Sequence, residues 1–486
     1  MFSLLIRDGM CIDIILYNGK IITVDKEFSI AEAIAIKGDI IEKVGLNSGI
    51  LPLAHAHTRK IDLHGKTVLP GLIDAHLHPI KASTSELFEK IPDVHTLQEL
   101  LDYIESQTRV KEQGAWIIHP QFFLTRIIEM RQPTKEELDN IAPNHPVFLN
   151  GSYAGMINSC ALNLCGITKD IGHPGVLKDS ETGEPTGIIR ASAFPLINKY
   201  IPTHEIGYDE EIDALENMLK RYNSVGFTSI TDGAQSPAGI RRYLDLWSCE
   251  RLPVRVCVNI RAPRYESRDQ FTAELKQLGF YSRFGNEMVR IGPLKVHIDG
   301  GILTGTAYLR QPWGLKAKEI YGIEDPEYRG ILNMKREQLF DIVSIANELG
   351  WKMTAHVTGG GGVDMLLDAY ENANKTEPIK NKRFSIIHGN FYTKEAIERC
   401  RKLGVIADFQ PAWFYKDADA MKYILGKERI KTFLPLRSML NGGMILNAGS
   451  DHMVKFDSYH SINPYNPFLN MWTMITRKTE RGSVIC

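Results

Sequence analysis

Two histidines in a short apolar run are the strongest local sign of chemistry in this sequence. His76 and His78 close the segment Pro-Gly-Leu-Ile-Asp-Ala-His-Leu-His and stand two residues apart. In a β-strand this spacing projects both imidazoles from one face. Convergent imidazoles are typical ligands of zinc and similar ions. Ordinary hydrogen bonding is the plain alternative, and the equally spaced pair His55 and His57, in a polar stretch, is expected on a surface loop.

Four more side chains able to bind a metal stand at the ends of other apolar runs. Lys295, His356 and His388 close such runs, and Asp451 follows another. Each one alone could simply cap a strand. Parallel strands of a closed barrel, however, bring their carboxyl ends to one mouth, where all these side chains would converge. The pattern therefore predicts a metal site.

The elements that must position these residues are expected from residue 67 onward. Short apolar runs alternate there with longer amphipathic stretches, which indicates repeated strand–helix units around a parallel sheet. Helices are expected at 335–349 and 393–403. Eight strands are expected, the number in a TIM (β/α)8 barrel: 72–78, 227–231, 254–260, 289–297, 352–356, 384–388, 405–410 and 444–447.

The connection between the first two expected strands is too long to be a simple loop. We expect an insertion at about 80–220, with helices at 97–107 and 135–141 and strands at 116–120 and 147–150. Because it follows a barrel strand, it would stand at the carboxyl-terminal face, where barrel enzymes build their active sites. It is therefore a candidate lid or pocket wall.

The first 66 residues form a pattern of short strands and turns. Strands at 12–17 and 20–24 flank Asn18–Gly19, which predicts a hairpin, and a second strand–turn–strand pattern is centred on Gly38. We expect a small β-sandwich-like domain at 1–66 and a barrel domain at 67–486.

Composition argues against several classes of partner. The formal net charge is −1, so nothing favours nucleic acid or an anionic membrane surface. No run of about 18 apolar residues predicts a transmembrane helix. The seven cysteines are scattered and form no CxxC motif, which indicates a reducing, cytoplasmic compartment. We expect a small-molecule substrate, and a homo-oligomer is left open.

The ordered set of motifs resembles the amidohydrolase superfamily. Within it, the likeness is to the branch that contains N-substituted formamide deformylase, amidohydrolase family 3. It runs from about Asp13 to the last residue. Besides His76 and His78, it is carried by motifs at 133–139, 157–162, 294–300, 306–309 and 410–413.

The resemblance implies a ligand set. His76 and His78 would bind the more buried of two divalent ions, and His356 and His388 the second. Lys295 would react with carbon dioxide and bridge both ions as a carbamate. As an ammonium it would repel metal ions, whereas a carbamate is an anionic ligand.

The resemblance also implies the reaction. Asp451 would bind the first ion and act as general base. Imidazole and carboxylate suit zinc, and a bound water would drop in pKa from about 15.7 to about 7 and give a hydroxide nucleophile. We expect a metal-dependent hydrolase of a carbon–nitrogen bond in an amide, formamide or cyclic amide. The alternatives are a mononuclear ester or lactone hydrolase and a catalytically silent binding protein.

Four further residues are candidates for holding the ligands or contacting substrate. Asp74 shares a face with His76, and His297 and Asp299 share one with Lys295. Structural hydrogen bonds or barrel packing are their plain alternatives. His452 stands where many relatives have tryptophan.

Two other segments carry expectations. The glycines at 359–362 are expected to form an active-site turn that uses positive φ, with an anion cradle as the alternative. Relatives complete the small β domain with strands that follow the barrel. The sequence ends soon after the eighth expected strand, so we expect those strands to be absent here.

Overall fold

The computed structural model describes residues 11–202 and 205–485, so Cys486 and the first ten residues of the expected β domain lie outside the described part. The chain divides into two compact units, Met1–Leu72 and Ile73–Cys486. The first unit holds two small sheets, with strand orders β5-β4-β1-β6 and β3-β2-β7. Its elements are β1 (Ile14–Tyr17), β2 (Lys20–Ile22), β3 (Ile30–Ala31), β4 (Ala33–Lys37), β5 (Ile40–Gly45), α1 (Asn47–Ile50), β6 (Arg59–Asp62) and β7 (Thr67–Val68).

The hairpin predicted at Asn18–Gly19 is wrong. β1 pairs with β4 and β6, whereas β2 pairs with β3 and β7, so the turn carries the chain from one sheet to the other. Asn18 adopts a φ of 56°, and its side chain donates to Asp62 Oδ2 at 2.9 Å. A Cβ on Gly19 would come within 2.3 Å of Leu63. Long-range packing therefore selects this dipeptide. The hairpin predicted around Gly38 is confirmed, since β4 and β5 pair antiparallel.

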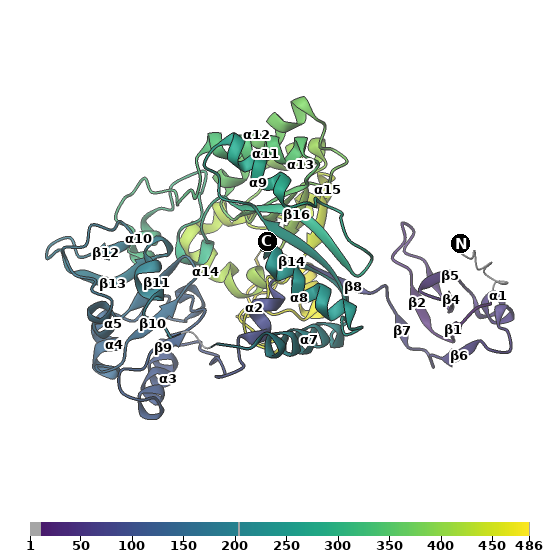
Figure 1. Ribbon diagram of the computed structural model, residues 1–486, viewed down its shortest axis with the longest axis horizontal. Helices are drawn as coiled ribbons and strands as arrows, with labels where there is room; N and C mark the ends of the chain where they lie inside the picture. Colours follow the sequence, from purple (N-terminus) through teal and green to yellow (C-terminus); the bar gives the residue numbers. More distant parts are fainter. Residues whose placement is uncertain (1–10, 203–204, 486) are drawn as a thin grey trace. The chain divides into compact units, whose positions relative to one another are not determined.

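The second unit is built on an eight-stranded parallel sheet that curls into a nearly closed barrel (Figure 1). Its order, β20-β19-β18-β17-β16-β15-β14-β8, follows the chain, as a TIM barrel requires. All eight predicted strands are present. They are β8 (Leu72–Leu77), β14 (Phe227–Gln235), β15 (Arg255–Arg261), β16 (Val289–His297), β17 (Met353–Val357), β18 (Ser385–His388), β19 (Ile406–Phe409) and β20 (Ile445–Ala448).

Two backbone hydrogen bonds join the ends of this sheet. The amide of Asp451, just after β20, donates to His76 O at 2.7 Å, and the amide of His78 donates to His452 O at 2.8 Å. The last loop thus acts as the partner of the first strand, and these bonds involve three of the predicted ligands, His76, His78 and Asp451.

Helices flank the strands on their outer side, as Figure 1 shows for α9, α11, α12 and α13. Within the described residues, no helix combines the length and apolar content that crossing a membrane requires. The helices that follow β14 are α8 (Pro237–Ser248), α9 (Arg268–Gln277), α10 (Leu315–Tyr321), α11 (Arg336–Glu348), α12 (Gly360–Thr376), α13 (Lys394–Leu403), α14 (Pro411–Arg429), α15 (Leu436–Asn441) and α16 (Pro467–Thr476).

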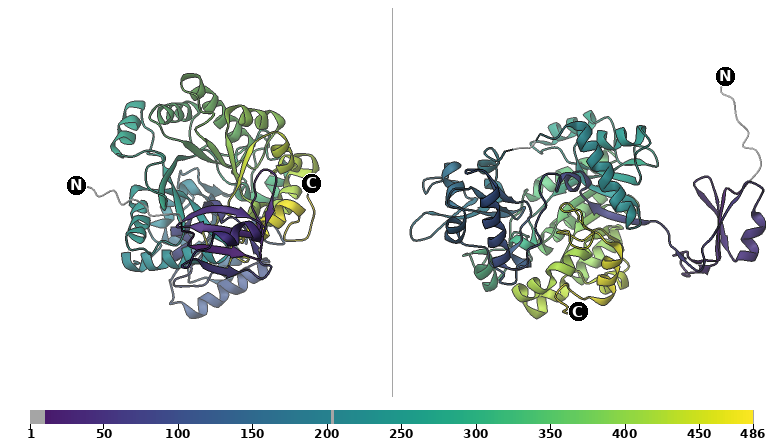
Figure 2. Two further views of the ribbon diagram at one scale, coloured as in Figure 1. Left: turned by 90° about the vertical axis from the view of Figure 1, so that its right-hand side faces the viewer. Right: turned by 90° about the horizontal axis from the view of Figure 1, so that it is seen from below.

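The segment between β8 and β14 contains a sheet of its own, with order β12-β13-β11-β10-β9. Side chains along β10 point alternately to the two faces of this sheet, and both faces are buried. Val147 and Leu149 pack in one hydrophobic core with α3 and α4. Phe148 packs in a second core with α5. Figures 1 and 2 show this sheet with its helices beside the barrel. The elements are α2 (Pro79–Thr84), α3 (Leu97–Val110), β9 (Ile117–His119), α4 (Lys135–Ile141), β10 (Val147–Asn150), β11 (Ala154–Ile157), α5 (Ser159–Leu164), β12 (Val176–Lys178), β13 (Pro185–Arg190), α6 (Pro195–Asn198) and α7 (Tyr208–Ser224).

Candidate active site

The strand ends bring all six predicted ligands to one place. Ring centroids lie 5.0 Å apart for His76 and His78, 5.5 Å for His76 and His388, and 4.6 Å for His356 and His388. Lys295 Nζ lies 3.4 Å from His76 Nε2. His78 is half-buried, and the other members of the set, Asp451 included, are buried.

Three of these residues present atoms that fit a cation. His76 Nε2 and His78 Nε2 lie 3.4 and 3.3 Å from Asp451 Oδ1, and the three ligand atoms lie within 4.8 Å of one another. Asp451 Oδ1 is buried and has no hydrogen-bond partner. A buried carboxylate oxygen without a partner is costly unless a cation compensates it. This nitrogen and oxygen donor set suits a zinc-like ion.

Burial sets the charge states in this cluster. Burial, reinforced by the nearby Lys295, lowers the pKa of His76 to about 3 and that of His356 to about 4. Burial alone would raise the pKa of Asp451, but His76 and His78 hold it well below its usual value. At neutral pH His76 and His356 are therefore uncharged and the Asp451 carboxylate is ionised, which are the forms that bind metal ions.

The backbone is strained at two of the six positions. His388 and Asp451 have φ values of 73° and 55°, in the left-handed region that residues other than glycine rarely adopt. The Asp451 amide donates to His76 O, and its carbonyl accepts from Asn463 Nδ2 at 2.7 Å. Such conformations cost about 1–3 kcal/mol each and persist where the surrounding structure enforces them, which is common at functional sites.

Neighbours outside the predicted set orient the histidines. His388 Nδ1 donates to Gln410 Oε1 at 2.7 Å, and the indole of Trp413 stacks on the same imidazole with centroids 4.5 Å apart. His388 Nε2 is thereby left free for a ligand. The Tyr153 hydroxyl lies 3.0 Å from His356 Nε2, which also contacts Gly300 O at 3.1 Å.

Sequence reasoning assigned no role to these orienting residues. Gln410 directly follows a strand end and Trp413 lies in a motif shared with the family, so their positions were a usable signal. Tyr153 comes from the segment between β8 and β14, and nothing local to it points to His356.

The two candidate carboxylates hold backbone. Asp74 accepts from the amides of His76 and Ser450 at 3.0 and 3.1 Å, and Asp299 accepts from the amides of Thr358 and Gly359 at 2.8 and 2.7 Å. Burial raises the pKa of each to about 7. Both contacts tie together loops that carry metal-binding candidates.

The two candidate histidines differ in position. His297 lines the pocket, and its ring stacks on His356 with centroids 5.3 Å apart. His452 has both nitrogens engaged elsewhere: Nδ1 accepts from the Tyr222 hydroxyl at 2.7 Å, and Nε2 donates to Lys455 O at 2.6 Å. The structure therefore does not bring the His452 ring to the reacting centre.

The reason for glycine at positions 359–362 differs from the expected one. Gly359 has a φ of −82°, and none of the four has a positive φ. A Cβ on Gly359 would lie 2.1 Å from Tyr308 O, so close packing requires glycine there. The amides of Gly361 and Gly362 both donate to Tyr308 O, at 3.0 and 3.1 Å. Occupied donors cannot cradle an anion, so both expectations for this segment are wrong.

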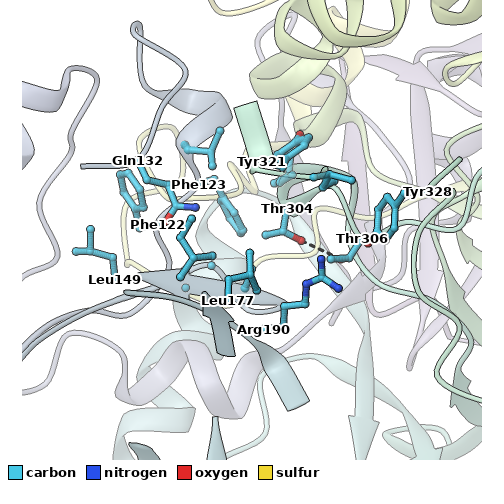
Figure 3. A pocket seen from close by; sticks show the side chains of 17 residues that line it. Phe122, Phe123, Gln132, Leu149, Leu177, Arg190, Thr304, Thr306, Tyr321 and Tyr328 are labelled. Carbon is cyan, nitrogen blue, oxygen red and sulfur yellow. Dashed lines mark hydrogen bonds between the residues drawn. The ribbon is translucent and has the colours of Figure 1, made fainter. Parts of the chain in front are cut away.

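A cavity of about 280 Å³ is lined by five of the six side chains, all but His76. Its walls include Gln121, Phe123 and Tyr153 from the segment between β8 and β14. Phe123 and Thr304 also line a smaller cavity of about 30 Å³, shown in Figure 3. That cavity has room for little more than water, so the larger one is the candidate substrate pocket.

Comparison with known proteins identifies the family. The sequence model of the amidohydrolase family matches residues 59–486. The chain belongs to the amidohydrolase family. The resemblance predicted from the motifs is therefore confirmed, and membership makes this amidohydrolase a hydrolase of the metal-dependent kind.

Individual relatives are distant but cover most of the chain. N-substituted formamide deformylase of Arthrobacter pascens is 27% identical over 489 residues, covering 97% of this amidohydrolase and 85% of the relative. Protein LONG AFTER FAR-RED 3 of Arabidopsis thaliana is 26% identical, covering 93% and 78% of the two chains. An uncharacterized metal-dependent hydrolase from Pyrococcus horikoshii OT3 shares the fold with a TM-score of 0.67 and 21% identity, covering 96% and 86%.

The contact between Gln410 and His388 yields a test. Replacing Gln410 with leucine removes the acceptor that fixes the His388 ring, so zinc affinity should fall about 10- to 100-fold. Zinc titration against a competing chelator measures this. Gln410→Glu, which keeps an acceptor, is the matched control and should bind zinc more tightly than the leucine variant. A folded Gln410→Leu protein with wild-type zinc affinity would show that this contact does not orient a ligand.

Proposed function

We propose that this amidohydrolase cleaves the carbon–nitrogen bond of a small amide, formamide or cyclic amide. The observation that carries the proposal is the group formed by His76, His78 and the unpartnered carboxylate oxygen of Asp451. The name of the Arthrobacter relative, a formamide deformylase, supports a substrate with this type of bond.

We assign one zinc-like ion to His76, His78 and Asp451. Lys295, His356 and His388 would hold a second ion, for which His356 Nε2 would exchange its contact with Gly300 O for the metal. Divalent ions bound here would supply Lewis acidity toward the carbonyl group and a nucleophile from water at neutral pH.

Lys295 is suited to carboxylation. It is buried, and burial lowers its pKa to about 8, so more of the amine is uncharged at neutral pH than for an ordinary lysine. The uncharged amine is the form that attacks carbon dioxide; the new nitrogen–carbon bond gives a carbamate and releases one proton. The product would place two anionic oxygens beside His76, where the ammonium group now stands.

We assign proton transfer to Asp451. Being ionised, its carboxylate can accept the proton of the attacking water and pass it to the amide nitrogen. That nitrogen leaves poorly until it is protonated. Tyr153 and Trp413 line the same pocket and would contact a bound substrate.

The cellular setting is part of the proposal. The six cysteines in the described part of the chain are all free, as a reducing, cytoplasmic compartment requires. A homo-oligomer is left open.

The proposed function predicts metal-dependent amide hydrolysis. A panel of small amides, formamides and cyclic amides is incubated with zinc-loaded protein, with protein stripped by a chelator, and with stripped protein to which zinc is returned. We expect hydrolysis of at least one panel member, its loss on stripping and its recovery with zinc. Hydrolysis of esters or lactones alone would contradict the carbon–nitrogen assignment, and equal activity after verified stripping would contradict metal dependence.

The role of Asp451 predicts a separation of chemistry from binding. Asp451→Asn keeps the shape of the side chain but cannot accept a proton at neutral pH. A general base contributes about 10² to 10⁴ in rate, so kcat should fall by that factor while KM changes little. Asp457→Asn, on an exposed loop, is the control and should keep wild-type kcat. A near-normal kcat in Asp451→Asn would rule out Asp451 as the base.

A further inference from the structure

A lysine in the substrate pocket forms no ion pair with any described carboxylate. Lys81 lies in α2, three residues after His78, and lines the pocket with His78 and Asp451. Its side chain retains access to solvent. The hydrogen bond that the structure gives Nζ goes to a thioether, Met453 Sδ, at 3.5 Å. Among the described residues, no carboxylate lies within ion-pair distance of Lys81. An ammonium group offers three donors, and a thioether is only a weak acceptor.

A second donor, from another element of the fold, contacts the same sulfur. Gln121 follows β9, is buried, and donates from Nε2 to Met453 Sδ at 3.3 Å. Its Oε1 has no hydrogen-bond partner. Two N–H groups from separate parts of the fold thus share one poor acceptor inside the pocket. Because both lie within hydrogen-bond range of one atom, a single small anion could accept from both.

Neighbouring cations are paired, which sets Lys81 apart. Arg126 binds Asp417 through two hydrogen bonds of 2.7 and 2.8 Å, and Lys455 lies 3.8 Å from Asp93. The Asp451 carboxylate, in the same pocket, attracts the Lys81 ammonium from a distance, but the two groups form no ion pair, and Asp451 Oδ1 faces His76 and His78. Lys81 is therefore not explained as the structural partner of a protein acid.

We propose that Lys81 and Gln121 form a binding site for an anionic group of the substrate, so that the preferred amide carries a carboxylate close to its scissile bond. The inference rests on the proposed function, because it places this anion beside the reacting centre. The carboxylate would accept from Lys81 Nζ and Gln121 Nε2 in place of the Met453 sulfur. Charge-assisted hydrogen bonds are about twice as strong as neutral ones, which makes Lys81 the main determinant of specificity.

Matched pairs of amides test this. N-acetylglycine and N-isobutylacetamide have the same shape but differ in charge on the amine side. N-methylsuccinamate and N-methyl-4-methylpentanamide differ in charge on the acyl side. Hydrolysis and equilibrium binding are both measured with the zinc-loaded protein. In at least one pair the anionic amide should bind about 10- to 100-fold more tightly than its neutral partner, as expected for a hydrogen bond to a charged group.

The variants separate this site from its surroundings. Lys81→Met should abolish the preference for the anionic amide by weakening the binding of that amide alone. Lys81→Arg should retain much of the preference. Gln121→Leu should reduce it by a smaller factor. Arg190→Gln is the charge control, since Arg190 lines the neighbouring small cavity of Figure 3 and not the substrate pocket. It should leave the ratio unchanged.

The outcomes distinguish this inference from the proposed function. Binding with the predicted preference but without hydrolysis would contradict the proposed function and support the anion site. Hydrolysis of neutral and anionic amides without a preference would do the reverse. The anion site would be overturned if Lys81→Met weakened binding of the anionic and the neutral amide equally. It would also be overturned if no member of either pair bound to the protein.

Discussion

The arrangement of the candidate ligands depends on the hydrogen bonds that the buried carboxylate of Asp74 accepts. It accepts from the amide of His76 on the first barrel strand and from the amide of Ser450 after the last. The sheet closes at this seam, and closure puts Asp451 opposite His76 and His78. Burial raises the Asp74 pKa to about 7. Burying the Asp74 carboxyl group costs free energy. Its hydrogen bonds offset this cost by joining the first and last strands of the barrel.

In the proposed function, chemistry and substrate recognition come from different parts of the second unit. The barrel supplies the imidazoles, the lysine and the carboxylate from strand ends, where rigid neighbours fix their directions. The segment between β8 and β14 supplies Gln121 and Tyr153, which reach the same pocket from outside the barrel. Changes at Gln121 can therefore alter the pocket without touching the candidate ligands, whereas changes at Tyr153 would also affect His356.

Local patterns predicted the barrel and the convergence of the six candidate ligands, because strand periodicity and strand ends are local properties. His356 and His388 could be placed at one mouth without knowledge of any contact. The rest depends on contacts between distant residues. Asn18–Gly19 has a hairpin sequence, but pairing with other strands decides its use. Tyr153 meets His356 across 203 positions and Gln121 meets Met453 across 332, and no pattern within one segment encodes such pairs.

The central claim is that the buried cluster at the barrel mouth is a divalent metal centre. X-ray absorption at the zinc edge of the loaded protein measures its ligands most directly. The account predicts one or two zinc ions per chain, coordinated by nitrogen and oxygen with the multiple-scattering signature of imidazole, and a loss of that signal in His76→Ala. A chain that takes up no zinc, or one in which sulfur ligands surround the ion, would contradict the account.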